Sequence, residues 1–275
     1  MNEKPEIAII ISTYNSVEWL KKTLWGYMYQ SFDDFELIIA DDGSDEFTRK
    51  IINQFAMFFK RKIVHVWHPD NGFQKSAILN KAILAAKADY ILMSDGDCIP
   101  KKNFVETHIK YRKPNYFISG GYFKLPMNIS NDINKTDIES GLCFDVKWLK
   151  LKGLKNSFRN RKLSAKGLEI DILNFITPTN ASWNGHNSSG WKKDIVRVSG
   201  FDERMQYGGQ DRELGERLIN IGVKSKQIRY STTCLHLDHA RGYKTKESID
   251  RNLAIRKETK TKKKTYTDFG LVKKA

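Results

Sequence analysis

Two acidic residues, Asp95 and Asp97, are separated by one glycine and closely follow the apolar run from Tyr90 to Met93. This run has the length and composition of a buried strand, and open α/β sheets bind ligands at the carboxyl ends of their strands. Carboxylates this close together repel unless a cation lies between them, and Mg²⁺ or Mn²⁺ shared with phosphate oxygens commonly fills that place. Because Asp-x-Asp also occurs by chance, the pair alone is equally consistent with a solvated turn.

The segments around this pair alternate between short apolar runs and helical patterns. Strands are predicted at residues 6–12, 35–40, 62–68 and 90–93, and helices at 17–30, 47–59 and 74–86. This order is typical of a parallel α/β sheet, in which right-handed crossovers place the carboxyl ends of all four strands at one edge. We therefore expect the residues that follow these strands to meet in one crevice.

The residues at these strand ends have the chemistry to hold a nucleotide. Tyr14 could stack on a ring, Asp42 could accept a hydrogen bond from a base imide, and Lys75 could meet a phosphate. Taken singly, Asp42 is more often a helix cap and Tyr14 a packing residue. Their expected convergence favours a nucleotide whose phosphates are bridged by a metal to Asp97.

The composition is that of a globular protein with a substantial core, since 40% of the 275 residues are hydrophobic and 12% are aromatic. No apolar run approaches the roughly 20 residues of a transmembrane helix, and the run at 7–11 is too short for a secretion signal. We therefore expect a soluble, cytoplasmic protein. Cys98, Cys143 and Cys234 are odd in number and widely spaced, which predicts free thiols rather than a disulfide framework or a zinc module.

The net charge of +15 is concentrated in two segments. Residues 241–275 hold 12 Lys/Arg against four Asp/Glu, a net charge of +8, and residues 147–166 hold eight basic residues and no acid. No recognisable nucleic-acid motif accompanies them, so nucleic acid is not expected as a partner, and a basic nucleic-acid-binding module is the least favoured alternative. The tail at 241–275 is predicted to be a charged helix, either solvated or attracted to anionic lipid.

An apolar spacing of three and four residues recurs between Leu142 and Arg161. Trp148, Leu151, Leu154 and Phe158 carry it, with lysines between them. The segment is interpreted either as an ordinary surface helix or as a basic amphipathic element that touches a lipid-linked acceptor or an anionic membrane at its inner, cytoplasmic face.

Four segments of the N-terminal half resemble glycosyltransferase family 2, which has the GT-A fold. They are IAIIISTYNS, FELIIADDGSDE, DNGFQKSAILNKAI and ADYILMSDGDCIPKKNFV. The similarity is greatest to bacterial members of the chondroitin-polymerase group, whose second half resembles a galactosyltransferase. The resemblance implies an α/β fold of the Rossmann-like GT-A type, with a mostly parallel central sheet flanked by helices. It divides one domain into a nucleotide-sugar-binding half at 1–120 and an acceptor-binding and catalytic half at 121–240, followed by the basic tail at 241–275.

The same resemblance implies inverting transfer from a nucleotide sugar, usually a UDP-sugar, with Mn²⁺ or Mg²⁺ on the Asp-x-Asp motif. It assigns Asp97 as the direct metal ligand. It places the nucleotide against Thr13, Tyr14, Asn15, Asp42, Gln74, Lys75 and Asp95. Within this set Tyr14 and Asp42 hold uracil and Asp95 lies near the ribose, whereas Gln74 stands where many relatives have arginine.

A second family pattern, GFDE…GGxD…RL…G, begins at Gly200 and ends at Gly222. Asp211 keeps the position of the catalytic base, and Gln210 replaces the carboxylate that usually binds the acceptor, which predicts a changed acceptor. The base would take a proton from the acceptor hydroxyl on the face of the sugar opposite the departing diphosphate. Residues expected to border the donor sugar or the acceptor are His186 and Asn187, in a polar loop at 184–191, together with Gly209 and Gln210.

A further metal ligand is expected from His236, with His239 as the alternative, because the distance of His236 past the Gly-Gly-x-Asp motif resembles the family. In an extended segment residues three apart point to opposite faces, so both imidazoles should not bind the metal. A structural role is the alternative for either histidine.

The predicted function is transfer of a hexose or N-acetylhexosamine from a UDP-sugar to a surface glycan or a lipid-linked oligosaccharide. A nucleotidyltransferase acting on a sugar phosphate is the alternative enzyme, because it too would use an α/β nucleotide site with acidic metal ligands. The N-terminal half lacks the glycine- and arginine-rich loop expected after the first strand of such an enzyme.

Overall fold

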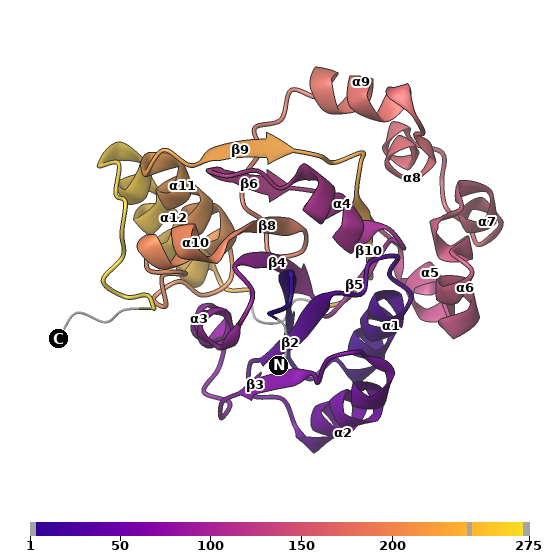
Figure 1. Cartoon of the computed structure of the whole chain (residues 1–275), viewed down its shortest axis with the longest axis horizontal. Helices are drawn as coiled ribbons and strands as arrows, with labels where there is room; N and C mark the ends of the chain where they lie inside the picture. The colour runs from indigo at the N-terminus through magenta and orange to yellow at the C-terminus, as the bar shows by residue number, and fades with distance from the viewer. Residues whose placement is uncertain (1–3, 241–243, 272–275) are drawn as a thin grey trace.

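Seven strands, in the order β3-β2-β1-β4-β8-β6-β9, form the main sheet of the computed structural model, which describes residues 4–240 and 244–271 (Figure 1). The strands are β1 (Ile7–Thr13), β2 (Phe35–Asp41), β3 (Val64–Trp67), β4 (Tyr90–Asp95), β5 (Cys98–Pro100), β6 (Tyr116–Ser119), β7 (Gly121–Lys124), β8 (Ser188–Trp191), β9 (Lys224–Gln227) and β10 (Thr233–His236). Strands β1 to β4 pair in parallel, and β8 runs antiparallel between β4 and β6. The four strands predicted from the N-terminal half therefore form, and their order confirms a mostly parallel α/β sheet.

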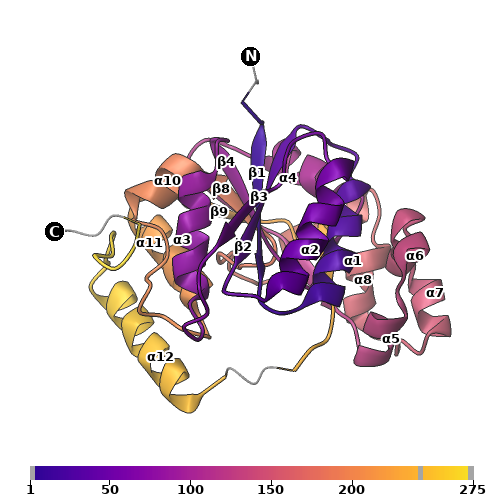
Figure 2. The ribbon, with the colours of Figure 1, turned by 90° about the horizontal axis from the view of Figure 1, so that it is seen from below.

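Helices cover both faces of this sheet (Figure 2). The helices are α1 (Val17–Met28), α2 (Glu46–Phe55), α3 (Lys75–Ala85), α4 (Phe104–Tyr111), α5 (Met127–Asp132), α6 (Lys135–Glu139), α7 (Val146–Leu151), α8 (Arg161–Ser164), α9 (Leu168–Ile176), α10 (Lys192–Arg197), α11 (Gln210–Asn220) and α12 (Lys246–Thr261), with short 3₁₀ turns at Ala56–Phe58, Leu142–Phe144 and Phe158–Asn160. Among the described residues, no helix combines the length and the apolar character needed to cross a membrane.

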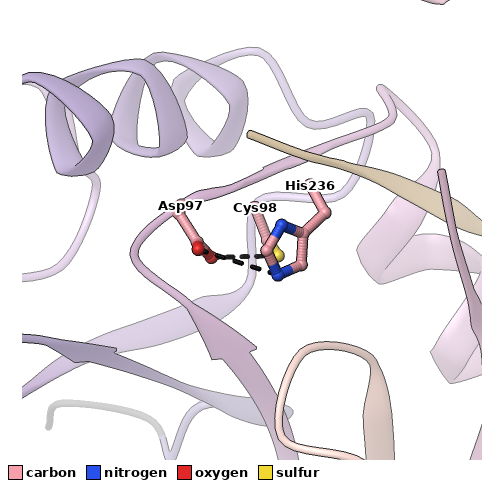
Figure 3. A group of neighbouring side chains, drawn as sticks. All are labelled: Asp97, Cys98 and His236. Atoms are coloured by element: carbon pink, nitrogen blue, oxygen red, sulfur yellow. Dashed lines mark hydrogen bonds and ion pairs between the residues drawn. The ribbon is translucent and has the colours of Figure 1, made fainter. Parts of the chain in front are cut away.

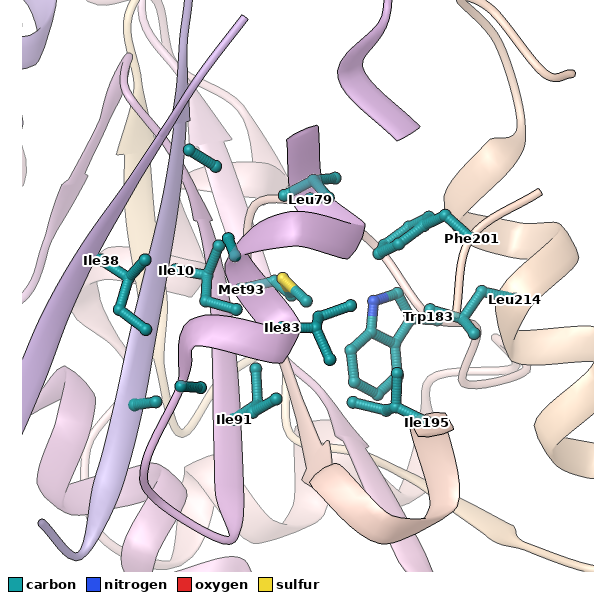
Figure 4. Packing of buried hydrophobic residues seen from close by; sticks show 14 of the residues in the cluster. Ile10, Ile38, Leu79, Ile83, Ile91, Met93, Trp183, Ile195, Phe201 and Leu214 are labelled. Carbon is teal, nitrogen blue, oxygen red and sulfur yellow. The ribbon is translucent and has the colours of Figure 1, made fainter. Parts of the chain in front are cut away.

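The side chains of β1 explain why its whole length is buried. Ile7, Ile9 and Ile11 pack on one face of the sheet with α1 and α2, whereas Ala8 and Ile10 pack on the other face with α3. A strand buried on both faces reads as a continuous apolar run rather than as an alternating one. The second face continues into the C-terminal half through Trp183, Phe201 and Leu214 (Figure 4), so both halves share one core.

A second, three-stranded sheet has the order β5-β10-β7. Strand β5 follows Asp97 directly and pairs antiparallel with β10, so Cys98 lies opposite His236. This pairing brings the Asp-x-Asp turn and the histidine segment together although more than a hundred residues separate them. The three cysteines are free, as predicted, and all three are buried.

The prediction of a single helix between residues 142 and 161 is wrong. Helix α7 ends at Leu151, and Gly153 has a positive φ of 96°, a backbone conformation that stops a helix and favours glycine. Leu154 then packs inward against a third apolar cluster, whereas Leu151 and Phe158 are exposed. The predicted apolar stripe is thus split between the inside and the surface.

The polar loop expected at 184–191 is also partly wrong, because its second half is strand β8. Ser188 and Ser189 are buried between β4 and β6, and Gly190 lies against the indole of Trp183, where a methyl group would approach within 2.9 Å. Small side chains are needed here because two neighbouring strands and a tryptophan enclose the segment. Composition alone indicated a loop, whereas sheet pairing requires these same small residues.

The charged helix predicted in the tail is present as α12. It packs against α11, where the Thr259 hydroxyl donates to Glu213 over 2.9 Å, and Asn252 is fully buried. Beyond it the backbone amide of Leu271 donates to the carbonyl of Ser199 over 2.7 Å. The tail residues at 241–243 and 272–275 lie outside the described residues. The described part of the tail therefore packs against the core. The predicted boundaries between the two halves at residue 120 and before the tail at residue 240 stay predictions.

Candidate active site

The Asp-x-Asp turn is held against the end of β1. The Gly96 amide donates to the carbonyl of Ser12 over 2.8 Å, and the Ser12 hydroxyl donates to the carboxylate of Asp95 over 2.8 Å. A methyl group on Gly96 would approach the Ser12 carbonyl oxygen to 2.9 Å, so glycine is required by this contact with β1. The turn is therefore held in place by hydrogen bonds to β1 and is not a solvated loop.

Lys75, the first residue of α3, reaches this turn and pairs with Asp95 at 2.7 Å. Burial alone would lower the pKa of the Lys75 ammonium, but the charges of Asp95, Asp211 and Asp97 outweigh burial and raise it. Burial likewise opposes ionisation of Asp95, but Lys75 holds the pKa of that carboxyl well below its usual range. Both groups are charged at neutral pH, and the ammonium lies in the field of acids from two distant motifs.

Asp97 faces the histidine segment at the end of β10. Its carboxylate lies 3.0 Å from Nε2 of His239 and 3.7 Å from Nε2 of His236, and the two imidazoles stack with centroids 5.8 Å apart. The inference that these histidines point to opposite faces is wrong. Strand β10 ends at His236, so the two-residue alternation of an extended strand no longer applies beyond it.

This cluster suits a divalent cation. Carboxylate and imidazole are ligands that Mn²⁺ accepts, and Asp97 and His236 lie together with Cys98 in one group (Figure 3). Burial raises the pKa of the Cys98 thiol well above its usual value, which makes it unsuited to a hard metal. Burial opposes ionisation of Asp97, but the two histidines lower its pKa, so the carboxylate is charged. The residues present therefore fit Mn²⁺, with Asp97 and one or both imidazoles as ligands, whereas Mg²⁺ would be held through the Asp97 carboxylate.

The residues predicted to hold uracil already have partners in the protein. Half-exposed Tyr14 donates its hydroxyl to Asp70 over 2.7 Å. The Asp42 carboxylate contacts Nε2 of His68 at 2.8 Å and accepts from the backbone amide of Gln74 over 3.0 Å. Burial raises the pKa of Asp42. His68 and Asp70 were not predicted, and they place the Tyr14 and Asp42 side chains at the ends of neighbouring strands.

Thr13 is the last residue of β1 and lies against Gly96 of the Asp-x-Asp turn, and Asn15 follows in the turn after the strand. Asn15 has a positive φ of 42°, and its side chain accepts from the amide of Asp45 over 2.9 Å, so it shapes the turn after β1. The Thr13 hydroxyl is buried and has no hydrogen-bond partner among the described residues. A buried hydroxyl without a partner is a candidate for contact with a ligand.

Asp211 lies in the first turn of α11, directly after a turn of two glycines with positive φ. Its carboxylate approaches Gly185 closely, since a methyl group there would lie 3.1 Å from Oδ1. Burial raises the pKa of Asp211 to about 6, and Oδ1 is buried without a hydrogen-bond partner among residues 4–240 and 244–271. A carboxylate with a pKa near neutrality and a free oxygen has the properties of a general base.

Gln210 and Gly209 precede this base. The Gln210 side chain is buried, and its Oε1 accepts from the Gly208 amide over 3.0 Å, so one of its polar atoms stabilises the turn itself. Gly209 has a φ of 90°, and a methyl group there would meet Arg256 of α12 at 2.9 Å. Contact of either residue with an acceptor stays a prediction.

Asn187 does not face this site. It is fully buried, and its Oδ1 lies 2.7 Å from Nε2 of His108 while its amide donates to the Gly121 carbonyl over 2.6 Å. His108, on α4, also contacts the Ser189 hydroxyl at 2.7 Å, and burial lowers its pKa to about 4, which keeps the ring neutral. The expectation that the Asn187 side chain borders the donor or the acceptor is therefore wrong, because this buried network uses both its oxygen and its nitrogen.

His186, the neighbour of Asn187, does face the cluster. The His186 ring lies edge-on to the Tyr122 ring, with centroids 4.6 Å apart, and its centroid lies 6.4 Å from that of His236. Burial lowers the pKa of His186 to about 4. A neutral imidazole beside the Asp97 group can donate or accept a hydrogen bond without adding charge. Tyr122, which contacts both imidazoles, was not predicted.

Comparison with known proteins identifies the family. The family model described as Glycosyl transferase family 2 matches residues 8–162, more than half of the chain. The chain belongs to this family. The prediction of a glycosyltransferase is thereby confirmed, in preference to a nucleotidyltransferase.

Several curated glycosyltransferases resemble this one over most of its length. They include the uncharacterized glycosyltransferase YfnE of Bacillus subtilis, with 26% identity over 90% of this chain and 68% of the relative. Chondroitin synthase of Escherichia coli is 27% identical over 81% of this chain and 33% of its own length. Hyaluronan synthase of Pasteurella multocida is 37% identical over 82% of this chain and 24% of its own length. The chain thus spans a third or less of the two synthases.

Solved structures confirm the GT-A fold of this glycosyltransferase. Mannosyltransferase PcManGT from Pyrobaculum calidifontis, in complex with GDP-Man and Mn²⁺, superposes with a TM-score of 0.58 and 16% identity over 88% of this chain and 59% of that one. Staphylococcus aureus TarS 1–349 in complex with UDP-GlcNAc has a TM-score of 0.57 and 12% identity over 86% of this chain and 60% of that one. At these identities the likeness establishes the fold alone.

Helix α12 supports the turn that carries Asp211, a role that no sequence pattern of this glycosyltransferase indicated. The Asn252 amide donates to three consecutive carbonyls, those of Gln206, Tyr207 and Gly208, at distances of 2.9 to 3.1 Å. Arg256, one turn later, packs against Gly209 and pairs with Glu216. The glycine turn before the base is thus held from outside by a helix that follows it in the chain.

Replacement of Asn252 by aspartate is expected to lower both stability and activity. The variant keeps the shape of the side chain but places a carboxylate oxygen where an amide donated to three carbonyls, a change worth about 1–3 kcal/mol. Asn220→Asp is the matched control, because Asn220 donates to the Thr259 and Lys264 carbonyls at the other end of the α11–α12 contact. Both variants should melt at lower temperature, and only Asn252→Asp should lower kcat. Equal kcat values in the two variants would assign Asn252 to stability alone.

Proposed function

We propose that this protein is an inverting, metal-dependent glycosyltransferase. It would transfer a hexose or N-acetylhexosamine from a UDP-sugar to a surface glycan or a lipid-linked oligosaccharide. The observation that supports this most is the position of Lys75. Its ammonium pairs with Asp95 at 2.7 Å, and the charges of Asp95, Asp211 and Asp97 together raise its pKa. This shared effect on one ammonium supports a transfer site in which the Asp-x-Asp turn and the Gly-Gly-Gln-Asp turn are the two sides.

On the donor side, the nucleotide would lie along the ends of β1, β2 and β4. The half-exposed ring of Tyr14 offers a stacking surface, and Asp42 lies beside it at the end of β2. Asp95 would lie near the ribose, and Lys75 carries the positive charge that a diphosphate requires. The solved structures with bound UDP-GlcNAc and GDP-Man support a nucleotide-sugar donor for this fold.

On the acceptor side, Asp211 would act as the base. Its free Oδ1 would take the proton of the acceptor hydroxyl while that oxygen forms a bond to the anomeric carbon and the bond to the diphosphate breaks. Because attack comes from the face opposite the leaving group, the anomeric configuration inverts. Asp97, with His236 or His239, would hold Mn²⁺ or Mg²⁺, which supplies positive charge to the leaving diphosphate when bound.

The acceptor class is proposed from the relatives. They include a chondroitin synthase and a hyaluronan synthase, whose names indicate glycan products. The acceptor region of this chain differs at Gln210, where the family pattern has an acid, so the acceptor is expected to differ from theirs.

The pH dependence follows from Asp211. Since burial raises its pKa to about 6, the carboxyl is protonated below that pH and cannot accept the acceptor proton. We expect kcat/KM to be constant above pH 7 and to fall about tenfold for each unit below pH 6. Thermal stability measured across the same range identifies any loss that reflects unfolding. A profile that is flat down to pH 4.5 would contradict the assignment of Asp211 as the base.

The test of the proposed function is release of UDP. The purified protein is incubated with a panel of UDP-hexoses and UDP-N-acetylhexosamines, with and without Mn²⁺, and melting temperature and UDP are both measured. We expect one donor to raise the melting temperature in the presence of Mn²⁺ and to yield UDP, with GDP-mannose as the comparison donor. Stabilisation and turnover by GDP-mannose alone would refute the choice of uridine nucleotide, and metal-independent turnover would refute the choice of mechanism.

A further inference from the structure

Helix α9 carries an exposed apolar face, which we call the α9 face. It consists of Leu168, Ile172, Phe175 and Ile176, whose exposed fractions are 80%, 57%, 90% and 59%. Their spacing of four, three and one residues places all four on one side of the helix. Exposed apolar residues are ordinary when scattered, but a contiguous stripe of this kind marks a surface that binds something.

The orientation of α9 is fixed from its other side. Leu173 is buried against Ala165 and Tyr230, with Ile170 packed beside them. The Asn174 side chain donates to the Ser231 hydroxyl over 2.9 Å and accepts from the Tyr230 amide over 3.0 Å. Rotation that buried the α9 face would break these contacts, so the face points outward because the fold requires it.

The chain leading to α9 is strongly basic. Of the eight Lys and Arg residues between Lys147 and Lys166, all but Lys162 are exposed, and no acid occurs among them. Leu151 and Phe158 are exposed between these cations. Helices α7, α8 and α9 follow one another along one flank of the molecule (Figure 1), so the basic segment at 147–166, which we call the basic border, leads directly into α9.

We propose that the α9 face and its basic border dock on the surface of an anionic lipid bilayer. Apolar side chains would enter the boundary between headgroups and acyl chains, and the cations would meet lipid phosphates. A symmetric pair of copies is a poorer occupant, since it would bring one basic border against another. This proposal differs from the membrane contact expected for a helix at 142–161, because the apolar side chains that enter the bilayer lie mainly on α9.

Docking here would bring the candidate active site close to the bilayer. The Lys162 ammonium, in α8, donates to the Tyr122 carbonyl over 3.1 Å and lies over the Tyr122 ring, which contacts His186. The docking itself does not depend on the proposed transfer reaction. Binding to lipid and release of UDP are measured separately, so either can fail without the other.

The test is sedimentation of the protein with vesicles of phosphatidylcholine, with and without added phosphatidylglycerol. The variant Ile172→Ser/Phe175→Ser should lower affinity for the anionic vesicles at least about tenfold. Met57→Ser/Leu84→Ser is the matched control, because these side chains are 79% and 58% exposed elsewhere on the surface. It should bind as the unmodified protein does, and circular dichroism and melting temperature confirm that both variants fold.

A charge variant tests the same surface by a gain of binding. Asp171 lies in the first turn of α9 beside the apolar face, and Asp171→Lys should strengthen binding to anionic vesicles at least about fivefold. Glu46→Lys, in the first turn of α2, removes an equivalent acid elsewhere and should have less effect. Equal binding to both kinds of vesicle, or no response to the α9 variants, would overturn the proposal. So would a dimer in solution that Ile172→Ser/Phe175→Ser dissociates.

Discussion

Replacement of Asp211 by asparagine is expected to lower kcat by about 10²- to 10⁴-fold and to leave the KM for the donor nearly unchanged. Asparagine keeps the shape of the side chain but cannot accept the acceptor proton. Because burial raises the pKa of Asp211 to about 6, removing its charge relieves a desolvation penalty. The melting temperature should therefore stay the same or rise, so a loss of activity cannot be attributed to unfolding.

The matched control for this variant is Asp194→Asn. Asp194 also lies in the first turn of a helix, α10, burial also raises its pKa, and its Oδ2 also has no hydrogen-bond partner in the described part of the chain. It lies outside the candidate site. We expect Asp194→Asn to keep full kcat; equal losses in the two variants would mean that Asp211 is not the base.

Replacement of Asp97 by asparagine is expected to abolish tight Mn²⁺ binding and to lower kcat/KM by about 10²- to 10³-fold. The Asp97 carboxylate contacts both imidazoles of the cluster. Loss of its charge removes the strongest ligand for a hard divalent ion. Calorimetric titration with Mn²⁺ measures the affinity independently of turnover.

The control for Asp97 is Asp70→Asn, which removes a carboxylate from the Tyr14 side of the site. It should leave Mn²⁺ affinity unchanged, although donor affinity falls. His236→Ala and His239→Ala then decide which imidazole binds the metal, since the ligand variant should weaken Mn²⁺ more. Full turnover of Asp97→Asn in the presence of EDTA would refute the metal-dependent mechanism.

The local sequence predicted the part of the molecule in which strand, turn and helix follow one another. The runs that became β1, β2 and β4 are buried on both faces, and each ends in the residues singled out for chemistry. The Asp-x-Asp and Asp211 sides were expected from the family motif to meet across the bound sugar. The charges of Asp95, Asp211 and Asp97 together raise the pKa of Lys75, which pairs with Asp95 at 2.7 Å.

The parts that failed depend on contacts between residues far apart in the chain. Asn187 was chosen from a polar composition, but His108, on another element, determines that its side chain points into the core. His236 and His239 were separated by strand geometry, but the strand ends between them. The helix expected at 142–161 broke at Gly153, whose backbone conformation the apolar spacing does not reveal.

The support of the glycine turn by α12 has a consequence for biosynthesis. The Asp-x-Asp turn contacts β1 and α3, from the first hundred residues, and its Asp97 also bonds to the segment that follows β10. The turn before Asp211 is completed by Asn252, which leaves the ribosome more than forty residues later than the turn itself. In a nascent chain the glycine turn before Asp211 therefore lacks its support until Asn252 has emerged, so the proposed base can be held in place only from that point on.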